Sequence, residues 1–326
     1  PVSEEKLFAM LKATSKQAVN GTDLFISGNI AFASQYFWVT PQEKGEEQPL
    51  QDETGRFYFL GNIRLDNRRE LIKSLKVNEN AHETISDAQL VLWAFRLWGY
   101  DCVNHLSGDF AFAIWEKLSH SLFLARDPLG VKNLAYIFQH HTFIAASEIE
   151  ALLAYPDIQF TVNDGKIAEM LASHFIDQDE SCYKQIQYLP PAHALLVSPD
   201  GIKKWRYWQI GPKFSLRYKR DEEYAEHLLE ILNACIKDRL RTFGAVGVSM
   251  SGGLDSPSVA ALAYRSLAVS STPQDCLRSY SYAFEKIKSC DESAYIHHML
   301  EKFPFSHHYV NCDSQWTLKD IETWPV

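Results

Sequence analysis

A short apolar strand that runs directly into a double-glycine turn and then into a helix is the feature that most constrains this chain. Residues 246–250 read Val-Gly-Val-Ser-Met, and residues 251–256 read Ser-Gly-Gly-Leu-Asp-Ser before a helical segment that ends near residue 267. Two glycines let the backbone approach an anion closely, and N–H groups at a helix N-terminus meet that anion with a favourable dipole. This order predicts a phosphate-binding turn in an α/β domain.

The polar residues of the turn have separate expected roles. Ser251 and Ser256 add hydroxyl donors beside Gly252 and Gly253. The carboxylate of Asp255 would repel a phosphate unless a cation lay between them, so we predict that Asp255 binds Mg²⁺ that bridges to nucleotide phosphates. A helix cap is the competing interpretation of Asp255.

The elements on both sides of the turn alternate between helix and strand. This alternation predicts a parallel-sheet α/β domain. The expected elements are helix 221–240, strand 245–250, helix 254–267, strand 278–284, helix 292–302 and strand 306–310.

The first two thirds of the chain has a different pattern, in which many short strands accompany a few helices. It predicts an α+β sandwich of two packed antiparallel sheets flanked by helices. We expect helices 4–13, 86–98, 147–153 and 164–173, with strands 24–27, 30–34, 37–40, 57–60, 110–115, 121–125, 134–138, 142–146, 193–197 and 203–208. The predicted domains are 1–208 and 220–326, joined by a linker at 209–219.

Composition excludes several classes of function. A chain of 326 residues is long enough for two domains. Its net charge of −9 argues against a nucleic-acid partner, which would favour a basic face. No apolar run approaches the length of about eighteen residues that a membrane span needs, so we predict no membrane partner and a cytoplasmic location. The six cysteines form no Cys-x-x-Cys pair, which disfavours zinc and a disulfide scaffold.

Several ordered motifs resemble one enzyme family. Residues 251–256 match its S-G-G-x-D-S pyrophosphatase loop. Residues 107–113 and 125–132 resemble its G-x-F-A-F and R-D-x-x-G-x-K stretches, 146–149 its A-S-E-I-K segment, and 188–193 with 205–208 its L-P-P-G-H and R-Y-W hairpin. From about residue 23 to its end the chain therefore resembles the asparagine synthetases and their relatives, the β-lactam synthetases and lasso-peptide cyclases.

This resemblance implies a fold and a set of ligands. The front domain would be a glutaminase-like domain of the N-terminal-nucleophile (Ntn) class, followed by an incomplete ATP-pyrophosphatase domain that uses ATP and Mg²⁺. The nucleotide-binding residues would be Met250, Ser251, Gly252, Gly253, Asp255, Ser256 and Tyr282. Met250 and Tyr282 would lie at adenine and contact it mainly through backbone groups.

Two of these assignments have open alternatives. An ordinary aromatic strand residue is the alternative for Tyr282. Asp291 and Glu292 correspond to an acidic pair that the family often has near the nucleotide, and an N-cap is the equal alternative.

The front domain departs from its family at the places that glutamine hydrolysis needs. In glutamine-using relatives a cysteine at the mature N-terminus attacks the amide. This chain begins with Pro1, and its first cysteine is Cys102. The family's arginine that binds the glutamine carboxylate aligns with Gln35 or Tyr36.

Two further family motifs are altered. The H-R-G-P-D segment aligns with residues 16–20, and the N-G-E motif that supplies the oxyanion hole reads Leu60-Gly61-Asn62. Only Gly61 and Asp87 persist. Replacing a preorganised amide donor by leucine costs about a hundredfold in rate or more, so we predict a front domain that is inactive as a glutaminase.

The preferred function is ATP-dependent amide-bond formation. A small-molecule or peptide carboxylate would be activated as its acyl-adenylate, and an amine or ammonia would then attack it. An intramolecular amide former of the β-lactam or lasso type fits this description. Ordinary asparagine synthesis from glutamine or ammonia is one alternative, and a non-catalytic binding module is another. The resemblance places the catalytic residues, a second magnesium ligand and the substrate-selecting residues beyond Val326.

Overall fold

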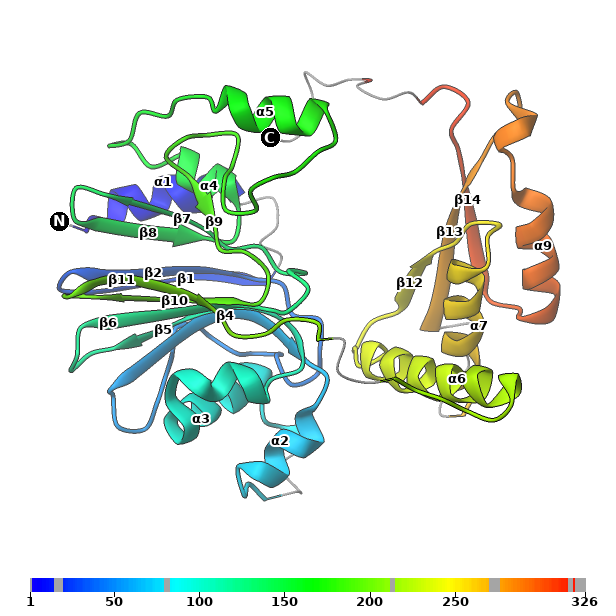
Figure 1. The fold of residues 1–326 in the computed structure, drawn as a ribbon, viewed down its shortest axis with the longest axis horizontal. Helices are drawn as coiled ribbons and strands as arrows, with labels where there is room; N and C mark the ends of the chain where they lie inside the picture. Colours follow the sequence, from blue (N-terminus) through cyan, green and yellow to red (C-terminus); the bar gives the residue numbers. More distant parts are fainter. Residues whose placement is uncertain are drawn as a thin grey trace. The chain divides into compact units, whose positions relative to one another are not determined.

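The computed structural model describes residues 2–14, 20–78, 83–211, 215–269, 276–315 and 319, and the chain divides into two compact units (Figure 1). The first unit comprises residues 1–38 and 42–213, and the second comprises residues 39–41 and 214–326. The division at 213–214 falls inside the predicted linker, whose own bounds stay a prediction.

A six-stranded antiparallel sheet forms the centre of the first unit. Its strand order is β11-β10-β6-β5-β4-β3. In chain order the strands are β3 (Leu50–Gln51), β4 (Phe57–Leu65), β5 (Gly108–Glu116), β6 (Ser121–Arg126), β10 (His193–Ser198) and β11 (Gly201–Arg206).

Two smaller sheets complete the unit. One has the order β8-β7-β9 and consists of β7 (Ala135–Gln139), β8 (Thr142–Ala146) and β9 (Gln187–Tyr188). The other is the hairpin of β1 (Gly21–Ser27) and β2 (Ile30–Tyr36). Gly28 has a φ of 62° in its two-residue turn, a conformation that glycine adopts readily.

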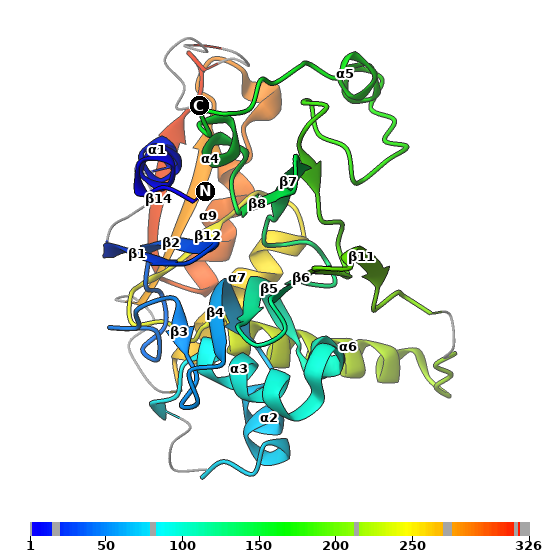
Figure 2. The same cartoon turned by 90° about the vertical axis from the view of Figure 1, so that its left-hand side faces the viewer.

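Helices cover both outer faces of the stacked sheets (Figure 1). Helices α1 (Glu4–Thr14) and α4 (Ile149–Leu153) pack against each other over the β8-β7-β9 sheet (Figure 2). Helices α2 (Arg68–Ser74) and α3 (Asp87–Trp98), with the 3₁₀ segment η3 (Gly99–His105), cover the six-stranded sheet. Helix α5 (Asp164–Leu171) follows α4.

The sequence of β5 explains how these layers pack. Its side chains alternate between the two faces of the sheet. Phe110, Phe112 and Ile114 belong to the core that includes α3, whereas Ala111 belongs to the core between the two sheets. Both sets are buried because the strand is covered on both sides.

The second unit is a parallel sheet with the order β12-β13-β14. Its strands are β12 (Val246–Ser249), β13 (Leu277–Ala283) and β14 (Ser306–Asn311), and its helices are α6 (Asp221–Arg239), α7 (Asp255–Leu267), η4 (Lys288–Cys290) and α9 (Ser293–Lys302). The core between strands and helices includes Met250, Leu262, Leu277 and Ile296. Since the strands are parallel, their carboxyl ends meet at one edge of the sheet.

These elements confirm the predicted fold class in both units, but they correct several of the individual predicted elements. Residues 37–40 are not a strand: β2 ends at Tyr36, which pairs with Gly21, the first residue of β1. Five short elements were not predicted, since seven residues or fewer are too few to show a periodic pattern: β3, β9, α2, η3 and η4.

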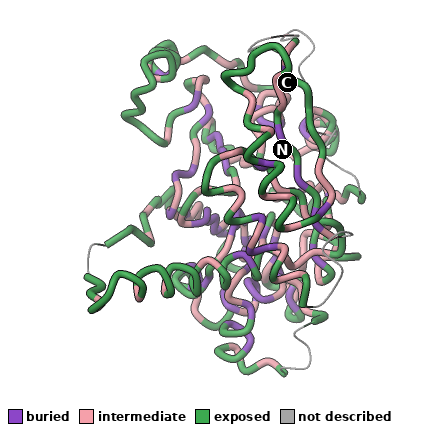
Figure 3. The backbone as a smooth tube through the Cα atoms, turned by 90° about the vertical axis from the view of Figure 1, so that its right-hand side faces the viewer, coloured by how far each residue is buried: buried purple, intermediate pink, exposed green. Residues whose placement is uncertain are grey.

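Most residues of β5 and α3 are buried, whereas most residues of α6 are exposed. Figure 3 colours the backbone by this burial. Within the described residues, no helix combines the length and the apolar character that crossing a membrane requires.

The close approach of β4 and β5 predicts an unequal response to two glycine substitutions. Gly108 has a φ of 143°, and a Cβ atom there would lie 2.1 Å from the carbonyl oxygen of Arg64. We expect Gly108→Ala to lower the free energy of unfolding by about 3 kcal/mol or more. Gly28→Ala, also at positive φ but with open space around it, should cost about 1 kcal/mol. Denaturant unfolding followed by tryptophan fluorescence measures both, and equal losses would contradict the steric argument.

Candidate phosphate-binding site

The predicted phosphate turn lies at the carboxyl edge of the parallel sheet, between β12 and α7. Its two serines connect its ends: the Ser251 N–H donates to Ser256 Oγ at 2.9 Å, and the two hydroxyl oxygens are 3.0 Å apart. The N–H of Gly253 points to Ser251 Oγ at 3.4 Å, which is a weak contact. Ser251 and Gly253 are exposed, so solvent-borne ligands can reach the turn.

Gly252 has no space for a side chain. A Cβ atom at this position would lie 2.9 Å from Glu292 Cβ and 3.1 Å from Tyr295 Cβ. The Gly252 N–H donates to Glu292 Oε2 at 2.9 Å, so a carboxylate from the start of α9 is bonded to the turn. This contact was not predicted, and its partners are 40 positions apart in the sequence, which leaves no local sequence signal for it.

Asp255 is the first residue of α7 and does not cap it. The N-cap position belongs to Leu254, and no side chain makes a capping hydrogen bond there. The Asp255 carboxylate is exposed. Among the residues that the structure describes, no group of three or more His, Cys, Asp or Glu side chains could hold a metal ion. A single carboxylate beside a phosphate site nevertheless fits Mg²⁺, which is commonly held by one or two carboxylates and by substrate phosphates.

The two predicted adenine residues differ in exposure. Met250 is buried, its N–H donates to the Tyr280 carbonyl at 2.9 Å, and its carbonyl accepts from Ser281 Oγ at 2.5 Å. Both of its backbone groups are therefore engaged within the sheet. Tyr282 is 69% exposed, so its ring is accessible to a ligand. Their contact with adenine stays a prediction.

The acidic pair after β13 has two different environments. Asp291 Oδ1 accepts from Ser293 Oγ at 2.8 Å and from the Phe284 N–H at 3.2 Å. The Ser293 hydroxyl, and then the Phe284 N–H, hold the pKa of Asp291 below its ordinary value, so this carboxylate is charged at neutral pH. Glu292 occupies the N-cap position of α9 without a side-chain capping bond, and it bonds Gly252 instead.

The two retained family positions of the front domain are engaged within that domain. The Gly61 N–H donates to Gln48 Oε1 at 2.8 Å, and Gln48 Nε2 donates to the Gly61 carbonyl at 3.1 Å. Asp87 is buried, accepts from the Leu65 N–H at 2.8 Å and forms an ion pair with Arg68.

Three other front-domain residues considered in the sequence are also engaged or buried within that domain. Gln35 Nε2 donates to the Leu11 carbonyl at 2.8 Å, and the Tyr36 hydroxyl donates to Asp23. Cys102 is fully buried, and this burial raises the pKa of its thiol, so the thiolate is disfavoured. Of the segment aligned with H-R-G-P-D, residues 16–19 lie outside the described residues.

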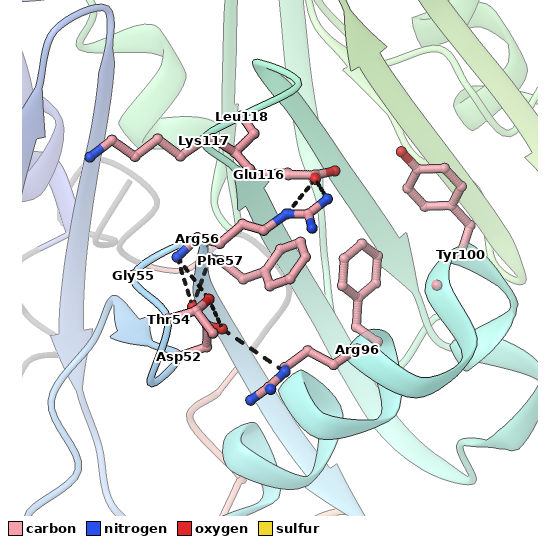
Figure 4. A pocket seen from close by; sticks show the side chains of 12 residues that line it. Asp52, Thr54, Gly55, Arg56, Phe57, Arg96, Tyr100, Glu116, Lys117 and Leu118 are labelled. Atoms are coloured by element: carbon pink, nitrogen blue, oxygen red, sulfur yellow. Dashed lines mark hydrogen bonds and ion pairs between the residues drawn. The ribbon is translucent and has the colours of Figure 1, made fainter.

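A pocket of about 890 Å³ lies elsewhere in the first unit, at the ends of β4 and β5 beside α3 (Figure 4). Two of the cations that line it are paired: Arg56 with Glu116, and Arg96 with Glu53 and more distantly with Asp52 at 3.9 Å. None of the predicted site residues lines this pocket.

Two family models match this chain, one after the other along the sequence. The family model described as a glutamine amidotransferase domain matches residues 2–208, and the asparagine synthase model matches residues 227–325. Asparagine synthetase [glutamine-hydrolyzing] 3 of Bacillus subtilis is 28% identical, covering 92% of this chain and 50% of its own length. Asparagine synthetase [glutamine-hydrolyzing] 2 of the same organism is 26% identical, covering 95% of this chain and 42% of its own length.

A third relative is named an amidase, not an asparagine synthetase. Amidase chry2 of Gibberella zeae is 26% identical, covering 85% of this chain and 42% of its own length. The chain thus spans half or less of the length of these three relatives. Because the amidotransferase model covers more than half of the chain and the asparagine synthase model follows it in order, the chain belongs to the asparagine synthetase family.

Proposed function

We propose that this protein is an ATP-dependent amide-forming ligase that activates a carboxylate as its acyl-adenylate. A carboxylate oxygen of a small molecule or peptide attacks the α-phosphorus of ATP, the α–β anhydride bond breaks, and pyrophosphate leaves. An amine or ammonia then attacks the acyl carbon, the amide bond forms, and AMP leaves. The cytoplasmic location stays a prediction.

The observation that carries this proposal is the turn formed by residues 251–256. It brings the hydroxyls of Ser251 and Ser256 within 3.0 Å of each other at the N-terminus of α7, which no side chain caps and where an anionic leaving group is stabilised. The carboxylate of Asp255 is exposed and is not used to cap the helix, which leaves it suited to a cation. Magnesium held there would neutralise charge on the departing pyrophosphate.

We further propose that the front domain does not hydrolyse glutamine. Leu60 stands where the family has its oxyanion amide, and neither Gln35 nor Tyr36 supplies a cation for the glutamine carboxylate. Asp87 is neutralised by Arg68. The amine would then come from free ammonia or from the substrate itself.

Ordinary asparagine synthesis is the second candidate. Two of the relatives are named glutamine-hydrolysing asparagine synthetases, which favours aspartate as the carboxylate and glutamine as the nitrogen source. The two candidates share the ATP site and differ in the source of nitrogen, so a glutaminase assay separates them.

The ATP site is tested by binding. We expect Ser256→Ala to weaken ATP binding about tenfold or more, because a hydrogen bond to a charged group contributes about 1.5–3 kcal/mol. Ser258→Ala is the matched control, since its hydroxyl donates to the Leu254 carbonyl at 2.6 Å and lies off the turn. Calorimetric titration measures both. A nucleotide-bound crystal structure should show adenine near Met250 and Tyr282, and adenine elsewhere would contradict the assignment.

A further inference from the structure

The carboxylate of Glu292 accepts a hydrogen bond from the backbone N–H of Gly252, a donor that a phosphate bound at the turn would also use. Its Oε2 atom accepts from the Gly252 N–H at 2.9 Å. A residue whose only purpose was to cap α9 would accept from an N–H of that helix, and Glu292 does not. Its side chain reaches across to the turn although it is exposed and free to point into solvent.

The backbone around Glu292 is anchored to neighbouring elements, although the carboxylate itself is exposed. Asp291 connects the start of α9 to the end of β13 through the Phe284 N–H and the Ser293 hydroxyl. On the other side, the missing Cβ of Gly252 lets the Glu292 stem lie against the turn. The fold of the second unit therefore places Glu292 beside the turn.

The carboxylate of Glu292 and a phosphate bound at the turn would compete for the Gly252 N–H. A charge-assisted hydrogen bond from an N–H to a carboxylate is among the stronger ones in proteins. Two anions that share one donor repel each other, and the Gly252 N–H is a single donor. A phosphate oxygen that bonds this N–H must first displace Glu292.

We propose that Glu292 is an internal competitor for the phosphate chain, which lowers the affinity of the turn for anions. The proposal rests on the proposed function, since it takes the turn to be the pyrophosphate site. Displacement costs the ligand one charge-assisted hydrogen bond. Glu292 thereby selects against weakly held anions and favours a polyphosphate that makes several contacts with the turn.

The experiment measures the binding of inorganic pyrophosphate in EDTA, so that no divalent cation bridges ligand and protein. Glu292→Gln removes the charge and Glu292→Ala removes the side chain. Both should bind pyrophosphate at least about tenfold more tightly than the unaltered protein, as expected when a competing charge-assisted hydrogen bond is lost. Glu301→Gln is the matched control: it removes one carboxylate from the same helix, where Glu301 pairs with His297 and His298, and it should leave binding unchanged.

The outcomes separate this inference from the proposed function. Equal binding by the unaltered protein and both Glu292 variants, with loss in Ser256→Ala, overturns the competitor role and leaves the site standing. Weaker binding in the Glu292 variants also overturns it, because Glu292 would then support the ligand. If neither pyrophosphate nor ATP binds any of these proteins, the proposed function fails and this inference fails with it.

Discussion

Asp255→Asn is expected to abolish the activity while the protein stays folded. The asparagine side chain keeps the size of the carboxylate but not its charge, so it is a poor ligand for Mg²⁺ beside phosphates. Because Asp255 makes no capping bond in α7, the free energy of unfolding should change by about 1 kcal/mol or less. ATP–pyrophosphate exchange, assayed across amino acids and peptides in the full-length protein, measures the loss.

The structure offers a closely matched control for this variant. Asp221 is the first residue of α6 and is exposed, as Asp255 is in α7. Asp221→Asn removes the same charge from the same helical position in the same unit, so it should cost similar stability and leave the exchange rate intact. Severe unfolding of Asp255→Asn with residual exchange activity would instead favour a structural role for the carboxylate.

The turn and the elements around it could be predicted because their signals are local. An apolar run, two glycines and an amphipathic segment lie next to one another at 246–267, and the structure has β12 and α7 there. A strand at 110–115 was likewise predicted, and β5 lies there, with its two faces in two different cores. In both cases the residues that determine the element lie within it.

The structural features that could not be predicted from the sequence depend on residues that lie far apart in the chain. The contact between Gly252 and Glu292 joins the first and second crossovers of the parallel sheet, and it exists only once β12 and β13 are paired. The end of β2 at Tyr36 is set by where β1 begins, although the aromatic residues at 37–40 have the composition of a strand. The ion pair of Asp87 with Arg68 similarly depends on α2, which was not predicted.

No glutamate is expected from glutamine in a preparation of this protein, even when a cysteine is placed at its N-terminus. A working glutaminase needs a nucleophile, a carboxylate clamp and an oxyanion donor together. A cysteine placed there supplies only the nucleophile. The loss of the oxyanion amide at Leu60 alone costs about a hundred- to thousandfold in rate, and the uncharged Gln35 and Tyr36 leave the substrate carboxylate unheld.

The absence of glutaminase activity must be distinguished from an unfolded domain. The front domain should give cooperative thermal unfolding by near-ultraviolet circular dichroism, because Phe59, Phe110, Phe112 and Phe123 are fully buried in one core. Leu60→Asn in the cysteine-bearing protein is the informative variant. It restores an oxyanion amide but no carboxylate clamp, so we expect glutamate release to stay undetected in a coupled glutamate dehydrogenase assay.

The nitrogen source then decides between the two candidate functions. Glutamine-dependent formation of asparagine by the full-length protein would overturn the inactive front domain and establish ordinary asparagine synthesis. Activity with ammonia alone would leave the inactive front domain standing, because that reaction needs only the ATP site. Amide formation with neither glutamine nor ammonia present would favour an amine carried by the substrate itself. The front domain would then serve as a folded partner of the ATP unit without chemistry of its own.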